Sequence, residues 1–150
     1  MIEYNYDENI VFLPGNVPSL KNSKIKTSRG IFPSATVKRY LQFLGVQRYS
    51  SSKKEVQGYV NRPNLFEDLR EYFEQLQGVE PPYKLGFHFV RKDKRDFDFN
   101  NATQIIQDLL VAHDMIEDDC CRILLPFPLE MDNRFYTVDK ENPGVYLKIL

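Results

Sequence analysis

The sequence predicts a single α/β (α+β) domain, in which a mixed β-sheet of about four strands packs with two or three helices. Strand-like and helix-like apolar patterns are interspersed along the chain, as in mixed domains. The 150 residues, 42% of them apolar, suffice for one buried core. No apolar run approaches the ~18 residues of a membrane span. We therefore expect a cytoplasmic protein with no signal peptide and no membrane partner.

The first half of the chain contains one predicted strand and two predicted helices. The apolar run 10–13 forms the strand, which a cluster of turn-forming residues closes. Ser34 caps a helix that continues to residue 44 with an apolar stripe on one face. The clearest helix covers residues 63–78, because Asn64 with a Glu three residues later matches a capping box and Gly78 is a typical helix end.

The second half of the chain predicts three strands and one helix. Residues 83–90 alternate between apolar and other side chains, which predicts a strand. An apolar stripe predicts a helix over residues 102–114. Residues 122–125 and 145–150 are further strands, joined by a proline-containing loop.

Positive charge is concentrated in the N-terminal third of the chain. Residues 10–54 contain no Asp or Glu, and this leaves all twenty-one acids to the rest of the chain. The segment carries nine cations: Lys21, Lys24, Lys26, Arg29, Lys38, Arg39, Arg48, Lys53 and Lys54. We expect a basic mobile loop near residues 20–30 and an elaboration of the fold near residues 42–62. Such a basic segment favours a nucleic-acid partner over a merely solvated loop.

Oxygen-bearing side chains are concentrated in a second region. If residues 96–100 are extended, Asp96, Asp98 and Asn100 lie on one face of a strand end. The helix that follows is long enough to bring Asp118 and Asp119 back toward them. Carboxylates and amides without nitrogen or sulfur ligands suit Mg²⁺. The alternative is a set of solvated acids at a strand end, with the later pair capping the next element.

Other polar residues near this region have simpler interpretations. Lys94 and Arg95 either contact phosphate or offset the neighbouring acids. The spacing of His113 from the apolar stripe predicts a histidine at the edge of the core. Cys120 and Cys121 are sequence neighbours, so we expect reduced thiols rather than a disulfide.

Several short motifs resemble those of the RusA family of Holliday junction resolvases. The family pattern is Asp-x-Asp-Asn, a Lys three residues later, Asp-x-Leu in a helix and a final Asp-Asp. The matching stretches are Asp98-Phe99-Asn100-Asn101, Asp108 with Leu110, Asp118-Asp119 and, for the family's Pro-Ser-x-x-Asn turn, Pro18-Ser19-Leu20-Lys21-Asn22. Together they cover roughly residues 10–30 and 84–125.

The resemblance implies a small homodimeric endonuclease that binds branched DNA, in particular four-way junctions, and nicks two opposed strands. It implies Mg²⁺ as the cofactor, with Mn²⁺ as a substitute. Asp98 and Asp119 would be the principal metal ligands, with Asp96, Asn100 and Asp118 completing or supporting the set. The residues expected to hold the DNA backbone are Lys21, Asn22, Lys24, Lys26 and Arg29.

Two positions depart from the family pattern. Matching back from Asp119 without a gap places Asn100 on the second motif Asp and Gln104 on the motif Lys. Asn100 is a neutral ligand, and Gln104 lacks the cation that could offset charge on the scissile phosphate. A gapped alignment would place Asp96 and Asp98 on the paired aspartates. An active nuclease, a junction-binding protein without cleavage and a structural domain with an acidic face therefore all remain open.

Overall fold

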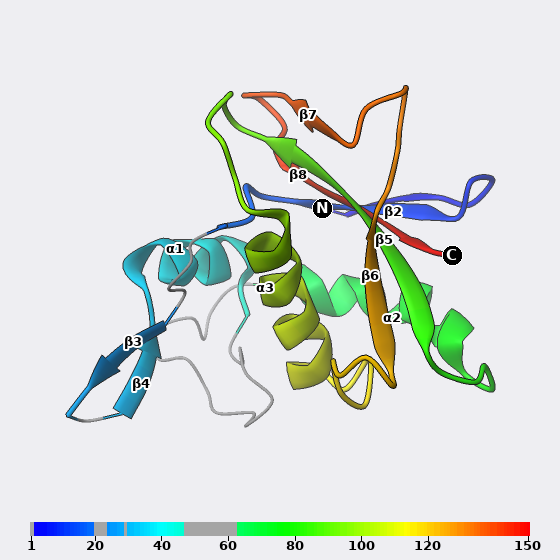
Figure 1. The fold of residues 1–150 in the computed structure, drawn as a ribbon, viewed down its shortest axis with the longest axis horizontal. Helices are drawn as coiled ribbons and strands as arrows, with labels where there is room; N and C mark the ends of the chain where they lie inside the picture. Colours follow the sequence, from blue (N-terminus) through cyan, green and yellow to red (C-terminus); the bar gives the residue numbers. More distant parts are fainter. Residues whose placement is uncertain (1, 20–23, 29, 47–62) are drawn as a thin grey trace.

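The computed structural model describes residues 2–19, 24–28, 30–46 and 63–150 (Figure 1). Its strands are β1 (Glu3–Asn5), β2 (Ile10–Pro14), β3 (Lys24–Thr27), β4 (Gly30–Pro33), β5 (Tyr83–Arg91), β6 (Leu124–Pro128), β7 (Tyr136–Val138) and β8 (Gly144–Ile149). Its helical segments are α1 (Ala35–Leu44), the 3₁₀ helix η1 (Phe66–Leu69), α2 (Arg70–Phe73), the 3₁₀ helix η2 (Glu74–Leu76) and α3 (Phe99–Ala112). The predicted mixed α/β class is confirmed.

Six of these strands form one mixed sheet. Its order is β1-β2-β8-β5-β6, and β7 pairs with the end of β5. β6 and β7 run parallel to β5, whereas the other neighbours are antiparallel. The predicted number of about four strands is wrong. β1 and β7 have three residues each, too few for a period-two pattern to show.

The predicted loop near residues 20–30 is wrong where the structure describes it. β3 and β4 form an antiparallel hairpin in which Ile25 pairs with Phe32 (Figure 1). The positive charge of this segment conceals its strand-like alternation. α1 follows the hairpin directly, and the Ser34 hydroxyl accepts a hydrogen bond from the Val37 N–H at 3.3 Å. The predicted cap and the predicted helix are therefore confirmed.

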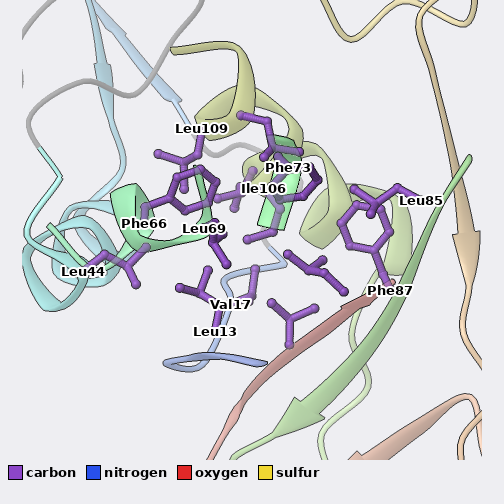
Figure 2. Close-up of a cluster of buried hydrophobic side chains, with 14 of the residues drawn as sticks. Leu13, Val17, Leu44, Phe66, Leu69, Phe73, Leu85, Phe87, Ile106 and Leu109 are labelled. Carbon is purple, nitrogen blue, oxygen red and sulfur yellow. The ribbon is translucent and has the colours of Figure 1, made fainter. Parts of the chain in front are cut away.

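One core joins the helices to a single face of the six-stranded sheet (Figure 2). The side chains of Leu85, Phe87 and Phe89 alternate along β5 and point to this face, as predicted. Ile106 and Leu109 of α3 pack above them with residues from α1, η1 and α2. α3 is thus held against β5, the strand that pairs with β6, β7 and β8, where it positions the candidate site.

The predicted helix over residues 63–78 forms as three short consecutive segments, η1, α2 and η2. Its predicted ends are confirmed: the Asn64 Oδ1 atom accepts from the Glu67 N–H at 3.1 Å, and Gly78 has a φ of +76°. Tyr72 joins this segment to the sheet. Its hydroxyl donates to the Asn9 carbonyl at 2.8 Å and accepts from the Ile149 N–H at 2.8 Å.

The structure describes only the start of the predicted elaboration near residues 42–62. Residues 42–44 complete the last turn of α1, and Val46 is buried in the core. Residues 47–62 lie outside the described residues. None of the described helices has the length and hydrophobicity needed to cross a membrane.

Candidate metal and nucleic-acid site along helix α3

The N-terminus of α3 is fixed by Asp98. Its backbone is extended, and its carboxylate accepts a hydrogen bond from the Asn101 N–H at 3.0 Å. Asp98 is therefore an N-cap, and the helix begins at Phe99, three residues earlier than predicted. The expectation that Asp96, Asp98 and Asn100 share a strand face is wrong, because β5 ends at Arg91 and Asn100 is already helical.

Asn101 connects α3 to the N-terminal turn of the chain. Its Nδ2 atom donates to the Ser19 carbonyl at 3.4 Å. The turn is also tied to the end of β5, since the Asn16 side chain accepts from the Lys92 N–H at 3.0 Å. The Arg91 guanidinium donates to the Val17 carbonyl in the same turn. Two segments that lie far apart in the sequence, and that both carry motif residues, therefore meet at the N-terminus of α3.

Gln104 connects the middle of α3 to the loop that follows the helix. Its Nε2 atom donates to the Asp119 carboxylate at 2.6 Å and to the Asp108 carboxylate at 2.8 Å. Gln104 and Asp108 are one helical turn apart and face the same side. The Asp118 carboxylate accepts from the Asp119 N–H at 2.8 Å. Asp119 thus contacts the middle of α3 at Gln104, whereas the predicted return was toward Asp96, Asp98 and Asn100 at the start of the helix.

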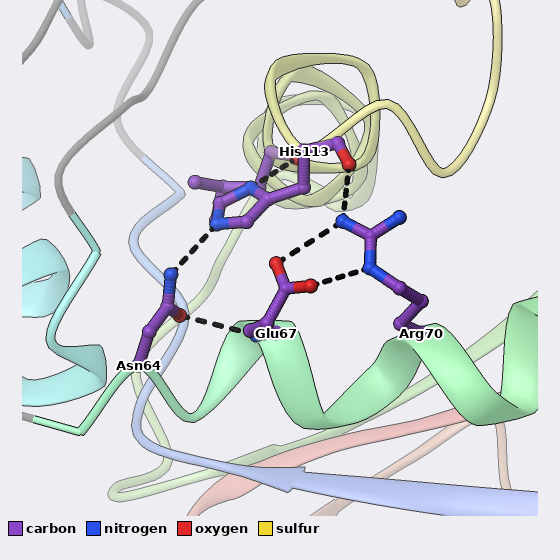
Figure 3. A network of polar contacts seen from close by, with 5 residues as sticks. Asn64, Glu67, Arg70 and His113 are labelled. Atoms are coloured by element: carbon purple, nitrogen blue, oxygen red, sulfur yellow. Dashed lines mark hydrogen bonds and ion pairs between the residues drawn. The ribbon is translucent and has the colours of Figure 1, made fainter.

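The opposite end of α3 is fixed by a polar network (Figure 3). The buried His113 ring bonds the Leu109 carbonyl through Nδ1 at 2.7 Å and the Asn64 amide through Nε2 at 3.0 Å. Arg70 donates to the His113 carbonyl at 2.6 Å and also pairs with Glu67. The hydrogen bond from Arg70 lowers the pKa of the Glu67 carboxyl below its usual value. His113 is therefore a histidine at the edge of the core, as predicted.

The end of β5 and the loop before α3 carry four cations, and three of them, Arg91, Lys94 and Arg95, have different surroundings. Arg91 is half-buried, and its guanidinium lies 4.6 Å from the centroid of the Phe97 ring. Burial lowers the Arg91 pKa from its usual value. Lys94 and Arg95 are exposed, and the Arg95 Nε atom lies 4.0 Å from an Asp93 oxygen. Arg95 is thus partly offset by an acid, yet its side chain remains 90% accessible.

The predicted metal ligands near α3 are oxygen donors, the type of ligand that a hard cation takes. Mg²⁺ takes oxygen ligands, keeps several waters and uses one or two protein carboxylates. Of the two principal predicted ligands, Asp98 is exposed and Asp119 is partly exposed. Across the described ranges, no three His, Cys, Asp or Glu side chains are grouped around one metal position. Asp96, Asn100 and Asp118 are exposed at the two ends of this region.

Of the predicted DNA-binding residues, Lys21, Asn22 and Arg29 lie outside the described residues. Lys24 and Lys26 occupy alternate positions of β3. Sequence reasoning missed the positioning roles of Asn16 and Arg91. The one sequence signal for these two roles is the presence of polar residues beside the motif turn.

Comparison with models of protein families gives no match, and the comparisons with curated proteins and with solved structures give none either.

Proposed function

We propose that this protein is a metal-dependent endonuclease of branched DNA, similar to the RusA family of resolvases. The contact between Gln104 and Asp119 is the main support, because it brings the terminal acidic pair onto the helix that carries the other motif residues. The contact between Asn101 and Ser19 adds support at the N-terminus of the same helix. A cytoplasmic location is part of the proposal, and it suits the free thiols of Cys120 and Cys121.

In this proposal Asp98 and Asp119 hold Mg²⁺, with Asp96, Asn100 and Asp118 as supporting oxygen donors. When bound, the ion supplies polarisation of the scissile phosphate and a water of lowered pKa. Gln104 orients the Asp119 carboxylate by donating to it. Lys94, Arg95 and the lysines of β3 contact the DNA backbone and so position the junction without reading its sequence. A symmetric dimer supplies the two sites that two opposed cuts require.

Cleavage of a labelled four-way junction in Mg²⁺ tests the proposal. Asp119→Asn and Asp98→Asn should both abolish nicking and leave binding in a gel shift unchanged. Asn caps a helix as well as Asp does, so Asp98→Asn removes the charge and preserves the N-terminus of α3. Glu80→Gln, at an exposed position between η2 and β5, is the matched control and should nick normally. Normal nicking by Asp119→Asn would refute the proposed site.

A second variant set tests the basic hairpin. Charge reversal at Lys21, Lys24 and Lys26 should weaken junction binding for all sequences alike. It should also flatten the salt dependence by about one unit of slope for each phosphate that these lysines no longer neutralise. Unchanged affinity would remove the hairpin from the interface. Sedimentation of the protein with and without a junction tests the dimer, and a monomer in both states would exclude paired cuts by one assembly.

A junction-binding protein without cleavage is the second candidate, and a specific observation favours it. Where the family has a lysine, this chain has Gln104, a neutral donor that already serves two carboxylates. Asn100 is likewise neutral. The double change Asn100→Asp and Gln104→Lys restores the family pattern. If the wild type binds a junction but does not nick it in Mg²⁺ or Mn²⁺, and the double variant does not nick it either, the binding function stands.

A further inference from the structure

A concave surface outside the candidate site along α3 includes residues of the N-terminal turn, Gly15 and Asn16. This groove has a volume of about 450 Å³ and lies between α1, the end of β2 and the turn before β8. Its volume falls within the roughly 300–1,000 Å³ that is usual for sites of small ligands. Two exposed cations line it: Arg39 from the acid-free N-terminal segment and Lys92 from the loop after β5. The fold thus joins two basic parts of the chain at one surface.

Two aromatic rings of α1 form one wall of the groove. Phe43 is 48% exposed and lines the groove together with the two cations. Gly15 has a φ of +109°, and a Cβ atom there would lie 2.9 Å from the Phe43 ring and 3.1 Å from the Tyr40 ring. The glycine therefore lets both rings lie directly against the backbone. This close approach holds the Phe43 ring in place with one side open.

The hydroxyl of Tyr40 adds an independent observation. Among the described residues, it is the one buried side-chain oxygen or nitrogen atom without a hydrogen-bond partner. Buried hydroxyl groups nearly always have a partner, and an unmet one is costly. Tyr40 lines the groove and is 4% exposed. A ligand that brings an acceptor oxygen to this wall would provide the missing partner.

We infer that this groove holds an unpaired nucleotide of a nucleic-acid strand. An exposed aromatic ring stacks a base of any sequence, and flanking cations bind the phosphates on either side. Phe43 supplies the ring, and Arg39 and Lys92 supply the cations. Glu141 also lines the groove. Because its carboxylate repels phosphate, the phosphates lie toward the two cations. The Glu141 carboxylate then accepts a hydrogen bond from a base amino group. The inference rests on the proposed function and names the feature of branched DNA that is bound: a base unpaired at the branch.

Fluorescence anisotropy with a labelled ten-nucleotide single strand, without divalent metal, tests the groove. Phe43→Ala should weaken binding by about 5- to 150-fold, the range for the loss of one stacked base. Arg39→Gln combined with Lys92→Gln should reduce the slope of the logarithm of affinity against the logarithm of salt concentration by about 0.7 for each phosphate left without its cation. Phe135→Ala and Lys84→Gln change exposed residues of the same types away from the groove and should bind as the wild type does.

Photocrosslinking provides a direct readout that does not depend on a variant. A single strand that contains 5-iododeoxyuridine should crosslink to the peptide containing Phe43, as located by mass spectrometry. The inference is refuted if Phe43→Ala binds the strand as tightly as the wild type does, or if the crosslinks form only at peptides outside the groove. If the wild type nevertheless nicks a junction, the proposed nuclease function is retained and only the nucleotide-binding groove is rejected. If Phe43→Ala loses binding while no nicking occurs, the groove stands and the nuclease proposal fails.

Discussion

Replacement of Gln104 by Glu is the sharpest test of the contacts along α3. The change is nearly isosteric, and it exchanges a donor for a charged oxygen close to the carboxylates of Asp108 and Asp119. Two unit charges 4 Å apart interact by about 1 kcal/mol in water. Because the Gln104 side chain is exposed, the solvent value applies and the side chain can partly turn away. We expect Gln104→Glu to destabilise the fold by about 1–2 kcal/mol at pH 7.

Thermal unfolding at pH 7 measures this change. For a domain of this size the loss corresponds to a decrease in Tm of about 2–8 °C. Addition of 10 mM Mg²⁺ should recover most of the decrease, because three adjacent carboxylates bind the ion in the folded state alone. Gln77→Glu, at an exposed glutamine after η2, is the control and should change Tm little. An unchanged Tm in Gln104→Glu would show that Gln104 does not bridge the two acids in solution.

Three further substitutions test the fold that supports the site. Tyr72→Phe removes both backbone hydrogen bonds of a phenol whose pKa burial raises to about 12, and urea unfolding should show a loss of about 1–2 kcal/mol. Gly144→Ala places a Cβ atom 2.5 Å from the Leu13 carbonyl and should cost about 3 kcal/mol or more, also by urea unfolding. Glu67→Gln should cost about 0.5 kcal/mol at pH 7 and nothing at pH 2, judged by Tm at both values. Arg70 lowers the folded-state pKa of Glu67, so their pairing stabilises the fold above the unfolded pKa and is lost as pH falls through the folded value.

The parts of the fold that are predictable from the sequence are those with a clear local signal. The strand β5 shows alternation over its length, and α1 has both an apolar stripe and a capping serine. The hairpin β3–β4 escapes prediction because its pairing depends on contacts across a turn, and its lysines resemble a solvated loop. The short strands β1 and β7 form because longer neighbours offer free edges, and this information lies outside their own three residues.

The sequence indicates which polar residues are candidates for the site, but not how the chain arranges them. The acidic residues after α3 are expected to return toward Asp98 and its neighbours, and Asp119 instead contacts Gln104 in the middle of the helix. The predicted position of Asp98 is wrong, because an Asp that follows a strand can either extend it or cap the next helix. The hydrogen bond that Asp98 accepts from the Asn101 N–H shows that Asp98 caps the helix. Such a choice depends on where β5 ends, and that point is set by its pairing with β7 and β8.

The same contacts bear on how the chain aligns with the family pattern. In the gapped alignment Phe99 stands on the motif Asn, but its ring packs edge-on against Phe89 with centroids 5.7 Å apart and offers no amide. In the gapless alignment the motif Asn is Asn101, whose amide reaches the Ser19 carbonyl of the N-terminal motif turn. Asn101, which joins two motif segments, is therefore a better counterpart of the motif Asn than Phe99, which packs among aromatic rings. The gapless alignment is therefore favoured, and Asn100, rather than Asp96, occupies the position where a carboxylate is expected.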